Sequence, residues 1–204
     1  MPAFQVLIAL LLYGALHSLT AAIGWKARVA AVIGERAFLG LYRLAYSIVS
    51  VVTLLPILGL MSAQPGNTVW RTTGLLASVL SALRALGGFG LALALVQIDG
   101  LRFLGIKEAI AYCRGQALPL PAERLATRGV YRLVRHPLYL FSMIALWASP
   151  VMTESQLGFT LAATTYFVVG SILEERKMAL AFGTAYLAYR SSVPWMIPFV
   201  KWGR

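Results

Sequence analysis

Two short stretches of the sequence carry most of the side chains that could do chemistry. The first contains Arg135 and His136 followed directly by Pro137, with Tyr139 two places further on. Proline is favoured in the first turn of a helix, because its missing N–H would be unpaired there. Free backbone N–H groups, the helix dipole and Arg135 together predict a pocket for a carboxylate or a phosphate. The alternative is that Arg135 and His136 only anchor the helix at lipid headgroups.

The second stretch is the acidic pair Glu174–Glu175, which ends a long apolar segment. Spaced aromatic and basic residues follow it: Tyr186, Tyr189 and Arg190. Two carboxylates beside an apolar segment are costly unless they are matched. We therefore expect one of them to form an ion pair and the other to stay free for an amine or hydroxyls. The cations within reach are Arg135, Arg176 and Lys177.

The composition indicates which elements must position these side chains. Of the 204 residues, 59% are apolar and only 12% are charged. Soluble domains average about 45–50% apolar and about 25% charged residues. The chain is therefore not an ordinary soluble domain, and its length suits about five membrane-spanning helices of roughly 20 residues each.

Five neutral, mostly apolar segments are candidate spans: about residues 1–25, 44–61, 74–98, 137–153 and 155–173. Pro150 and Glu154 mark a short turn between the last two, which makes them a helical hairpin. Residues 101–114 have the apolar spacing of an amphipathic helix on the membrane surface. The sequence thus predicts an all-α integral membrane protein in three parts: helices one to three in 1–98, a connector in 99–136, and helices four and five with a cofactor-binding cytoplasmic tail in 137–204.

The basic residues are distributed unevenly between the two ends of these helices. The connectors after helices one, three and five hold 16 of the 18 Lys and Arg, whereas the opposite side holds only Arg71. Cytoplasmic loops of membrane proteins are enriched in Lys and Arg. We expect a multi-pass protein of a bacterial inner membrane, with the amino terminus outside and the carboxy terminus in the cytoplasm. The same loops explain the net charge of +11, so lipids are expected around the chain and no nucleic acid.

Other chemistries find little support in the sequence. A single cysteine, Cys113, forms no intramolecular disulfide, and two histidines are too few for an ordinary metal site. No glycine-rich turn follows a predicted strand, as nucleotide-binding folds require. The glycine cluster Gly87-Gly88-Phe89-Gly90 lies in the third predicted helix, where small residues favour close helix packing.

The predicted hairpin also brings the two chemical stretches together. The start of helix four and the end of helix five lie at one membrane depth, so the first stretch should face Glu174 and Glu175 across a few ångströms to a little over ten.

Arg84, near the middle of the third helix, must face a cavity, a carboxylate or another polar partner, because a charge at mid-membrane is costly. An acceptor-site role and a buried or snorkelling contact are its two interpretations. His17 and Ser18 of the first helix form either an interhelical hydrogen bond or part of a substrate cavity.

Three spaced motifs resemble one superfamily of membrane enzymes. They are Arg135-His136-Pro137-x-Tyr139, the Glu174-Glu175 pair, and Phe-Gly-x-x-Tyr186-x-x-Tyr189-Arg190 with a Val-Pro behind it. They are similar to the carboxy-terminal half of the membrane methyltransferases, which include isoprenylcysteine carboxyl and phospholipid methyltransferases. This resemblance covers about residues 127–199. Residues 130–139, 147–153 and the stretch around His17 look closest to the branch of methanethiol S-methyltransferase, NnrU-type and nurim-like proteins.

The resemblance implies S-adenosylmethionine as cofactor, bound between helices four and five and the carboxy-terminal segment. The implied cofactor residues are Arg135, His136, Pro137, Tyr139, Glu174, Glu175, Tyr186, Tyr189 and Arg190. The cofactor's carboxylate suits Arg135 and His136, its ammonium suits a glutamate, and its sulfonium suits aromatic faces. No metal is expected, since methyl transfer from a sulfonium needs none.

The branch suggests a small or lipid-soluble thiol as acceptor, methanethiol in the first place. A thiol reacts as its thiolate, so His136 or Glu174 is the expected proton acceptor, with Arg84 as a third catalytic candidate on the acceptor side. A prenylcysteine carboxylate or a phospholipid amine is the alternative within the enzyme class. A non-catalytic membrane scaffold, or an accessory to a respiratory or denitrification system, is the alternative from another class.

Overall fold

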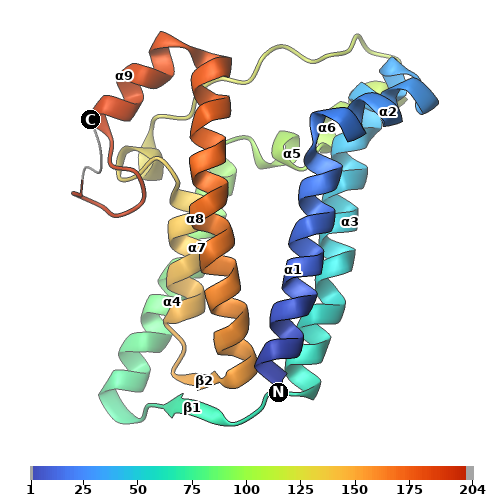
Figure 1. The fold of residues 1–204 in the computed structure, drawn as a ribbon. Helices are drawn as coiled ribbons and strands as arrows, with labels where there is room; N and C mark the ends of the chain where they lie inside the picture. The colour runs from blue at the N-terminus through green and yellow to red at the C-terminus, as the bar shows by residue number, and fades with distance from the viewer. Residues whose placement is uncertain (1, 201–204) are drawn as a thin grey trace.

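The computed structural model describes residues 2–200, which are mostly helical (Figure 1). The helices are α1 (Pro2–Ala21), α2 (Ile23–Ile33), α3 (Glu35–Ala63), α4 (Gly74–Gln97), α5 (Gly100–Phe103), α6 (Ile106–Cys113), the 3-10 helix η1 (Gly129–Arg132), α7 (Pro137–Trp147), α8 (Glu154–Phe182) and α9 (Thr184–Ser192). Strands β1 (Thr68–Arg71) and β2 (Val151–Thr153) pair antiparallel. They close one end of the bundle, whereas α2, α5, α6 and α9 lie at the other (Figure 1).

Four of these helices are long and apolar enough to cross a membrane: α1, α3, α4 and α8. Their outward faces carry exposed large apolar side chains, among them Leu12, Leu75 and Phe89. A water-soluble bundle would bury such extensive apolar surface, whereas lipid accommodates it. The structure therefore confirms an all-α integral membrane protein.

The fourth predicted helix is shorter than the sequence suggested. α7 ends at Trp147 instead of near Thr153, and its 11 residues make about 16 Å of helix, roughly half of an apolar core of about 30 Å. After α7 the chain turns at Ser149 and Pro150 into β2, which pairs with β1. The Trp70 indole N–H donates to the Ser149 carbonyl oxygen at 3.0 Å and fixes this turn.

Small residues allow α7 to lie directly against α4. A Cβ added at Gly87 would come within 2.6 Å of the Ala145 backbone nitrogen, and one at Gly90 within 2.3 Å of the Phe141 ring. Gly88 has open space instead. The predicted packing role of this glycine cluster is thereby confirmed, and the packing fixes the helix that begins beside His136.

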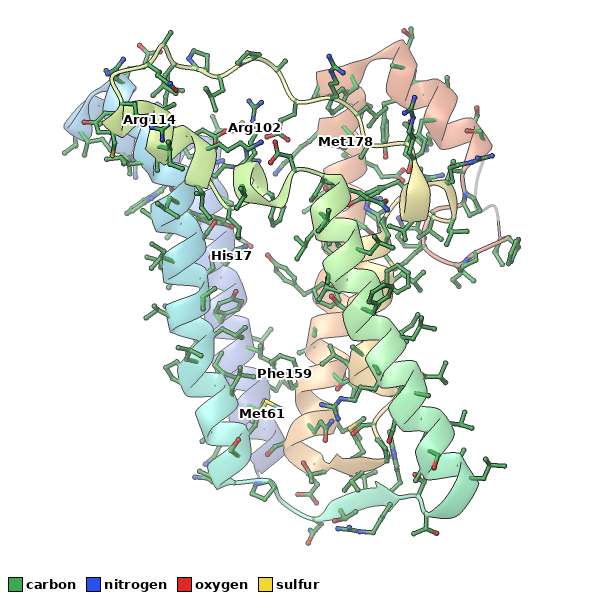
Figure 2. All side chains as sticks on the ribbon, turned by 180° about the vertical axis from the view of Figure 1, so that it is seen from behind. His17, Met61, Arg102, Arg114, Phe159 and Met178 are labelled. Carbon is green, nitrogen blue, oxygen red and sulfur yellow. The ribbon has the colours of Figure 1, made fainter. Side chains whose placement is uncertain are left out.

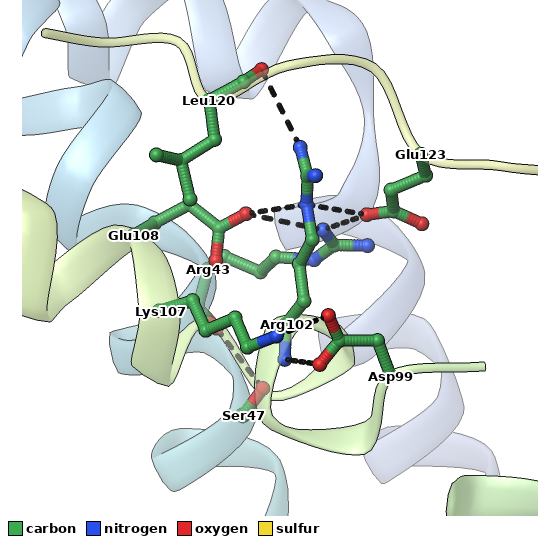
Figure 3. A network of polar contacts seen from close by, with 8 residues as sticks. All are labelled: Arg43, Ser47, Asp99, Arg102, Lys107, Glu108, Leu120 and Glu123. Carbon is green, nitrogen blue, oxygen red and sulfur yellow. Dashed lines mark hydrogen bonds and ion pairs between the residues drawn. The ribbon is translucent and has the colours of Figure 1, made fainter. Parts of the chain in front are cut away.

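The predicted surface helix over 101–114 is broken in two. Gly105 separates α5 from α6 with a φ of +81°, and a Cβ there would meet the Leu44 nitrogen at 2.4 Å. An ionic network fastens this region to α3 (Figure 3): Arg43, Arg102, Glu108 and Glu123 form four ion pairs of 2.6–3.8 Å. The connector is thus held at the end of the bundle where α9 also lies.

Candidate cofactor site

The first chemical stretch begins α7 as predicted. His136 is the residue before the helix and Pro137 is its first residue. The backbone N–H of Arg135 donates to the carbonyl oxygens of Pro194 at 2.8 Å and Trp195 at 3.1 Å, and that of His136 donates to Trp195 at 3.3 Å. These two amides therefore hold the carboxy-terminal segment, whereas the predicted anion pocket at the first turn of α7 stays a prediction.

Arg135 and Glu175 form the central ion pair of the site. Arg135 Nε lies 2.6 Å from Glu175 Oε1, and both side chains are largely buried. Arg135 Nη1 also donates to the carbonyl oxygens of Arg190 and Val193, at 3.0 and 2.7 Å. Arg190 Nε lies 3.5 Å from the other oxygen of Glu175. Glu175 is therefore the paired member of the acidic couple, and its pairing joins α7, α8 and the segment after α9.

His136 lies between the two carboxylates. Its Nε2 is 3.3 Å from Glu175 Oε1 and its Nδ1 is 3.7 Å from Glu174 Oε2. Burial by itself would lower the pKa of His136, but Glu174 and Glu175 outweigh it and hold that pKa above its usual value. The protonated imidazolium is thus favoured here. Glu174 remains 45% exposed on its side chain, so it is the more accessible of the two carboxylates.

The aromatic residues of the site divide into two kinds. Tyr139 stacks on the His136 ring, with centroids 5.7 Å apart. The Tyr189 hydroxyl donates to the Tyr131 carbonyl oxygen at 2.6 Å, which is a buried structural bond. Tyr186 is 1% exposed, and its hydroxyl has no partner among the described residues. Burial, together with the nearby Glu175 charge, raises the pKa of Tyr186 to about 12, so this buried hydroxyl stays neutral.

A cavity of 430 Å³ opens beside the cluster. It is lined by Arg135, Ile172, Glu175, Arg176, Ala179, Arg190 and Trp195. Its volume lies in the range of about 300–1,000 Å³ that is typical of small-molecule sites. A larger hollow of 680 Å³ lies between the end of α4 and residues 122–128 and contains none of the predicted site residues.

Arg84 is not part of this cluster. Its Nη1 donates to Ser149 Oγ at 3.3 Å, and Ser149 follows the far end of α7 from His136. The contact favours the second interpretation of Arg84, a buried polar partner, and its acceptor-site role stays a prediction. The predicted interhelical hydrogen bond of His17 is present, with Nδ1 2.9 Å from Ser50 Oγ of α3. Sequence reasoning missed Tyr46 and Ser50, although their spacing of four residues on an apolar helix was a signal.

These features define a class of protein: an α-helical membrane protein with a cluster of ionic side chains where two antiparallel helices meet a carboxy-terminal segment. Residues 76–185, more than half of the chain, match the phospholipid methyltransferase family, and the chain belongs to that family. The predicted superfamily is therefore confirmed.

Three individual proteins are similar in sequence to parts of this chain. Methanethiol S-methyltransferase 2 of Bradyrhizobium diazoefficiens is 35% identical over 130 residues, which cover 64% of this chain and 49% of that protein. Methanethiol S-methyltransferase of Pseudomonas deceptionensis is 34% identical over 134 residues, covering 65% and 50%. Protein-S-isoprenylcysteine O-methyltransferase A of Arabidopsis thaliana is 37% identical over 80 residues, covering 38% and 41%. The chain thus spans about half the length of the curated relatives it matches. No solved structure matches it.

Proposed function

We propose that this chain is a membrane methyltransferase that uses S-adenosylmethionine to methylate a small thiol. The observation that carries the proposal is His136 held between Glu174 and Glu175 beside the 430 Å³ cavity. Family membership supports a methyl transfer, and the names of two relatives support methanethiol as the acceptor.

The residues present fit the charges of this cofactor. Its ammonium suits Glu174, since that carboxylate is half-exposed whereas Glu175 is engaged by arginine. Its carboxylate suits the Arg190 guanidinium, which is also half-exposed and lines the cavity. The unpaired Tyr186 hydroxyl offers a further hydrogen bond, and the Tyr139 ring offers an aromatic face to a sulfonium.

When bound, the cofactor supplies a sulfonium-borne methyl group for in-line transfer to a nucleophile. The chain contributes alignment and exclusion of water. The Arg135–Glu175 pair holds the carboxy-terminal segment against the hairpin and so forms one wall of the cavity. The two carboxylates stabilise the proton of His136, so we assign this side chain to binding anionic groups of the ligand and not to accepting a proton from the acceptor.

We propose that the protein lies in a bacterial inner membrane. The end of the bundle with α2, α6 and α9 then faces the cytoplasm, and α1 begins outside. The excess of basic residues in the connectors at that end supports this orientation. Lys201 and Arg204, which contribute to the excess, lie outside the described residues. A reporter after Arg204 should read cytoplasmic and one near Asn67 external; the reverse result would contradict the orientation.

The test of the proposed function uses the full chain purified in detergent. Calorimetry should show binding of S-adenosylmethionine, and labelled cofactor should methylate a thiol in a panel that also holds prenylcysteine and phospholipid acceptors. Glu174→Gln should weaken cofactor binding about tenfold or more, as expected for one lost charge-assisted hydrogen bond. Glu154→Gln is the matched control, because Glu154 begins the same helix and pairs with Asn67 at its other end.

Each alternative corresponds to a distinct result of this panel. Methylation of prenylcysteine alone would favour a carboxylate acceptor, and methylation of phospholipid alone an amine. Absence of cofactor binding would favour a non-catalytic scaffold.

A further inference from the structure

A second polar cluster lies inside the bundle, within the apolar segments of α1 and α3. His17 of α1 contacts two side chains of α3: its Nδ1 is 2.9 Å from Ser50 Oγ, and its Nε2 is 2.5 Å from the Tyr46 hydroxyl. The rings of Tyr13 and Tyr166 also pack around His17, with centroids 5.7 and 6.2 Å away. Figure 2 labels His17 between the levels of Phe159 and Met178.

The hydrogen bonds of this cluster define the tautomer of His17. Ser50 has one hydroxyl proton, and it donates that proton to the Tyr46 carbonyl oxygen at 2.7 Å. Ser50 Oγ therefore accepts from His17, which places the ring proton on Nδ1. The lone pair on Nε2 then accepts from the Tyr46 hydroxyl. His17 is thus arranged as a neutral imidazole whose Nε2 can take a proton.

The cluster lies close in depth to the cofactor site. Gly158 of α8 lies against Ala3 of α1, and Gly14 of α1 lies against Tyr166 of α8, so these two helices run side by side. His17 therefore lies at about the level of residues 169–172 of α8. Glu174 is about one helical turn, roughly 5.4 Å, further along α8 from Gly170. A Cβ at Gly170 would meet only the Tyr139 hydroxyl, at 3.8 Å. This face of α8 therefore lies toward Tyr139 of α7.

An apolar cavity of 320 Å³ borders the same cluster. Its lining includes Trp25, Val29, Tyr42 and Tyr46, from the α1–α2 region and α3. A small apolar molecule entering from lipid would reach the Tyr46 side chain there. Neither His136 nor Glu175 lines this cavity.

We propose that His17, through the Tyr46 hydroxyl, accepts the proton of the thiol acceptor. This inference rests on the proposed function and assigns the step that His136 is poorly suited to perform. The thiol S–H bond breaks as its proton passes to Tyr46 Oη, and the Tyr46 proton passes to His17 Nε2. The thiolate sulfur then forms a bond to the methyl carbon while the sulfonium carbon–sulfur bond breaks. The products are a methyl thioether, S-adenosylhomocysteine and a proton, which leaves His17 for solvent.

The first test compares two acceptors of small size. Methanethiol is mostly protonated at pH 8, whereas hydrogen sulfide is largely ionised there and needs little help from a base. His17→Gln should lower turnover with methanethiol by about 10²–10⁴-fold, the usual contribution of general base catalysis. The loss of turnover that the same variant shows with hydrosulfide should be at least tenfold smaller than its loss with methanethiol. Affinity for S-adenosylmethionine should stay within twofold of the wild type.

The control is Thr53→Val, which removes a hydroxyl that donates to the Val49 carbonyl oxygen within α3 and should leave both turnovers unchanged. Equal losses for the two acceptors in His17→Gln would overturn the assignment. If that variant does not fold, Tyr46→Phe decides, because it removes the hydroxyl that relays the proton and should show the same dependence on acceptor with a loss of similar size. A wild type that binds cofactor but methylates no thiol would overturn the proposed acceptor, and this step with it.

A second test requires no turnover. The chain has only two histidines, so ¹⁵N-histidine labelling gives two sets of resonances that His17→Gln assigns. At pH 7 His17 should show the neutral tautomer with its proton on Nδ1. An imidazolium, or a proton on Nε2, would overturn the arrangement.

Discussion

The two histidines of this chain occupy opposite kinds of environment. His136 lies at the start of α7 between two carboxylates, whereas His17 lies inside α1 between two hydroxyl groups. The carboxylates favour the imidazolium, because a charged partner stabilises the charged form. The hydroxyls satisfy a neutral ring, which suits an apolar segment where a charge is costly. The partners of His136 thus stabilise a charged ring, whereas the partners of His17 match an uncharged one.

Glu175→Gln should cause the largest loss of stability, because it removes the carboxylate charge that pairs with Arg135 and contacts His136. Arg135 would remain buried without its carboxylate, and breaking a buried pair in this way costs about 3–5 kcal/mol. The free energy of unfolding in mixed micelles measures the loss. Glu174→Gln is the comparison and should cost less than about 1 kcal/mol, since Glu174 is half-exposed. Equal losses would mean that Glu175 does not hold the segment after α9.

His136→Gln should produce a loss of stability that depends on pH. The pKa of His136 is raised in the folded state, so its contribution is complete below about pH 6.5, the unfolded value, and disappears as pH rises through the folded value. At pH 6 the variant should be less stable than the wild type by about 1.5–3 kcal/mol, and at pH 9 the difference should shrink. A difference that grows with pH would show that His136 is neutral in the folded chain.

Gly87→Ala should disturb the surroundings of His136 and leave those of His17 intact. The added methyl group would strike the α7 backbone, and overpacking of this kind costs about 1–3 kcal/mol. The ¹⁵N resonances of His136 should shift while those of His17 stay in place. Gly88→Ala, which meets open space, should move neither set; matching shifts at both histidines would mean that the two sites are not independent.

Two tyrosines of α9 should separate stability from ligand binding. Tyr189→Phe loses the buried hydrogen bond to Tyr131 and should cost about 1 kcal/mol of stability. Tyr186→Phe removes a hydroxyl without a partner among the described residues, so stability should hold while affinity for S-adenosylmethionine falls. Melting curves measure the stability of both variants, and calorimetry measures their affinity for the cofactor. A loss of affinity in Tyr189→Phe with a loss of stability in Tyr186→Phe would contradict these two roles.

Arg84→Leu should have the smallest effect on either histidine. Its contact with Ser149 lies at the far end of α7, so cofactor affinity and methyl transfer should be unchanged. Replacing such a charge by an apolar residue can alter stability slightly in either direction. A change of acceptor preference in this variant would return Arg84 to the acceptor site.

The sequence determined the elements and much of the chemistry of this protein. Apolar segments of spanning length predicted the long helices, and Pro137 predicted where α7 begins. The hairpin alone was enough to place Arg135 near Glu175, because two antiparallel helices joined by a short turn fix which residues share a level. The ion pair of one carboxylate with a nearby cation was also predicted and is present between Glu175 and Arg135.

Only the tertiary structure decided which groups remain available. It showed that Glu174 is the more exposed carboxylate, that carbonyl groups of the carboxy-terminal segment accept from the Arg135 and His136 amides, and that Arg84 contacts Ser149. It also brought Tyr46 and Ser50 to His17 across two helices. Periodicity along one helix records which face is apolar, but rotation and level relative to a neighbouring helix depend on packing. The partners of a polar side chain between helices are therefore set by the assembled bundle.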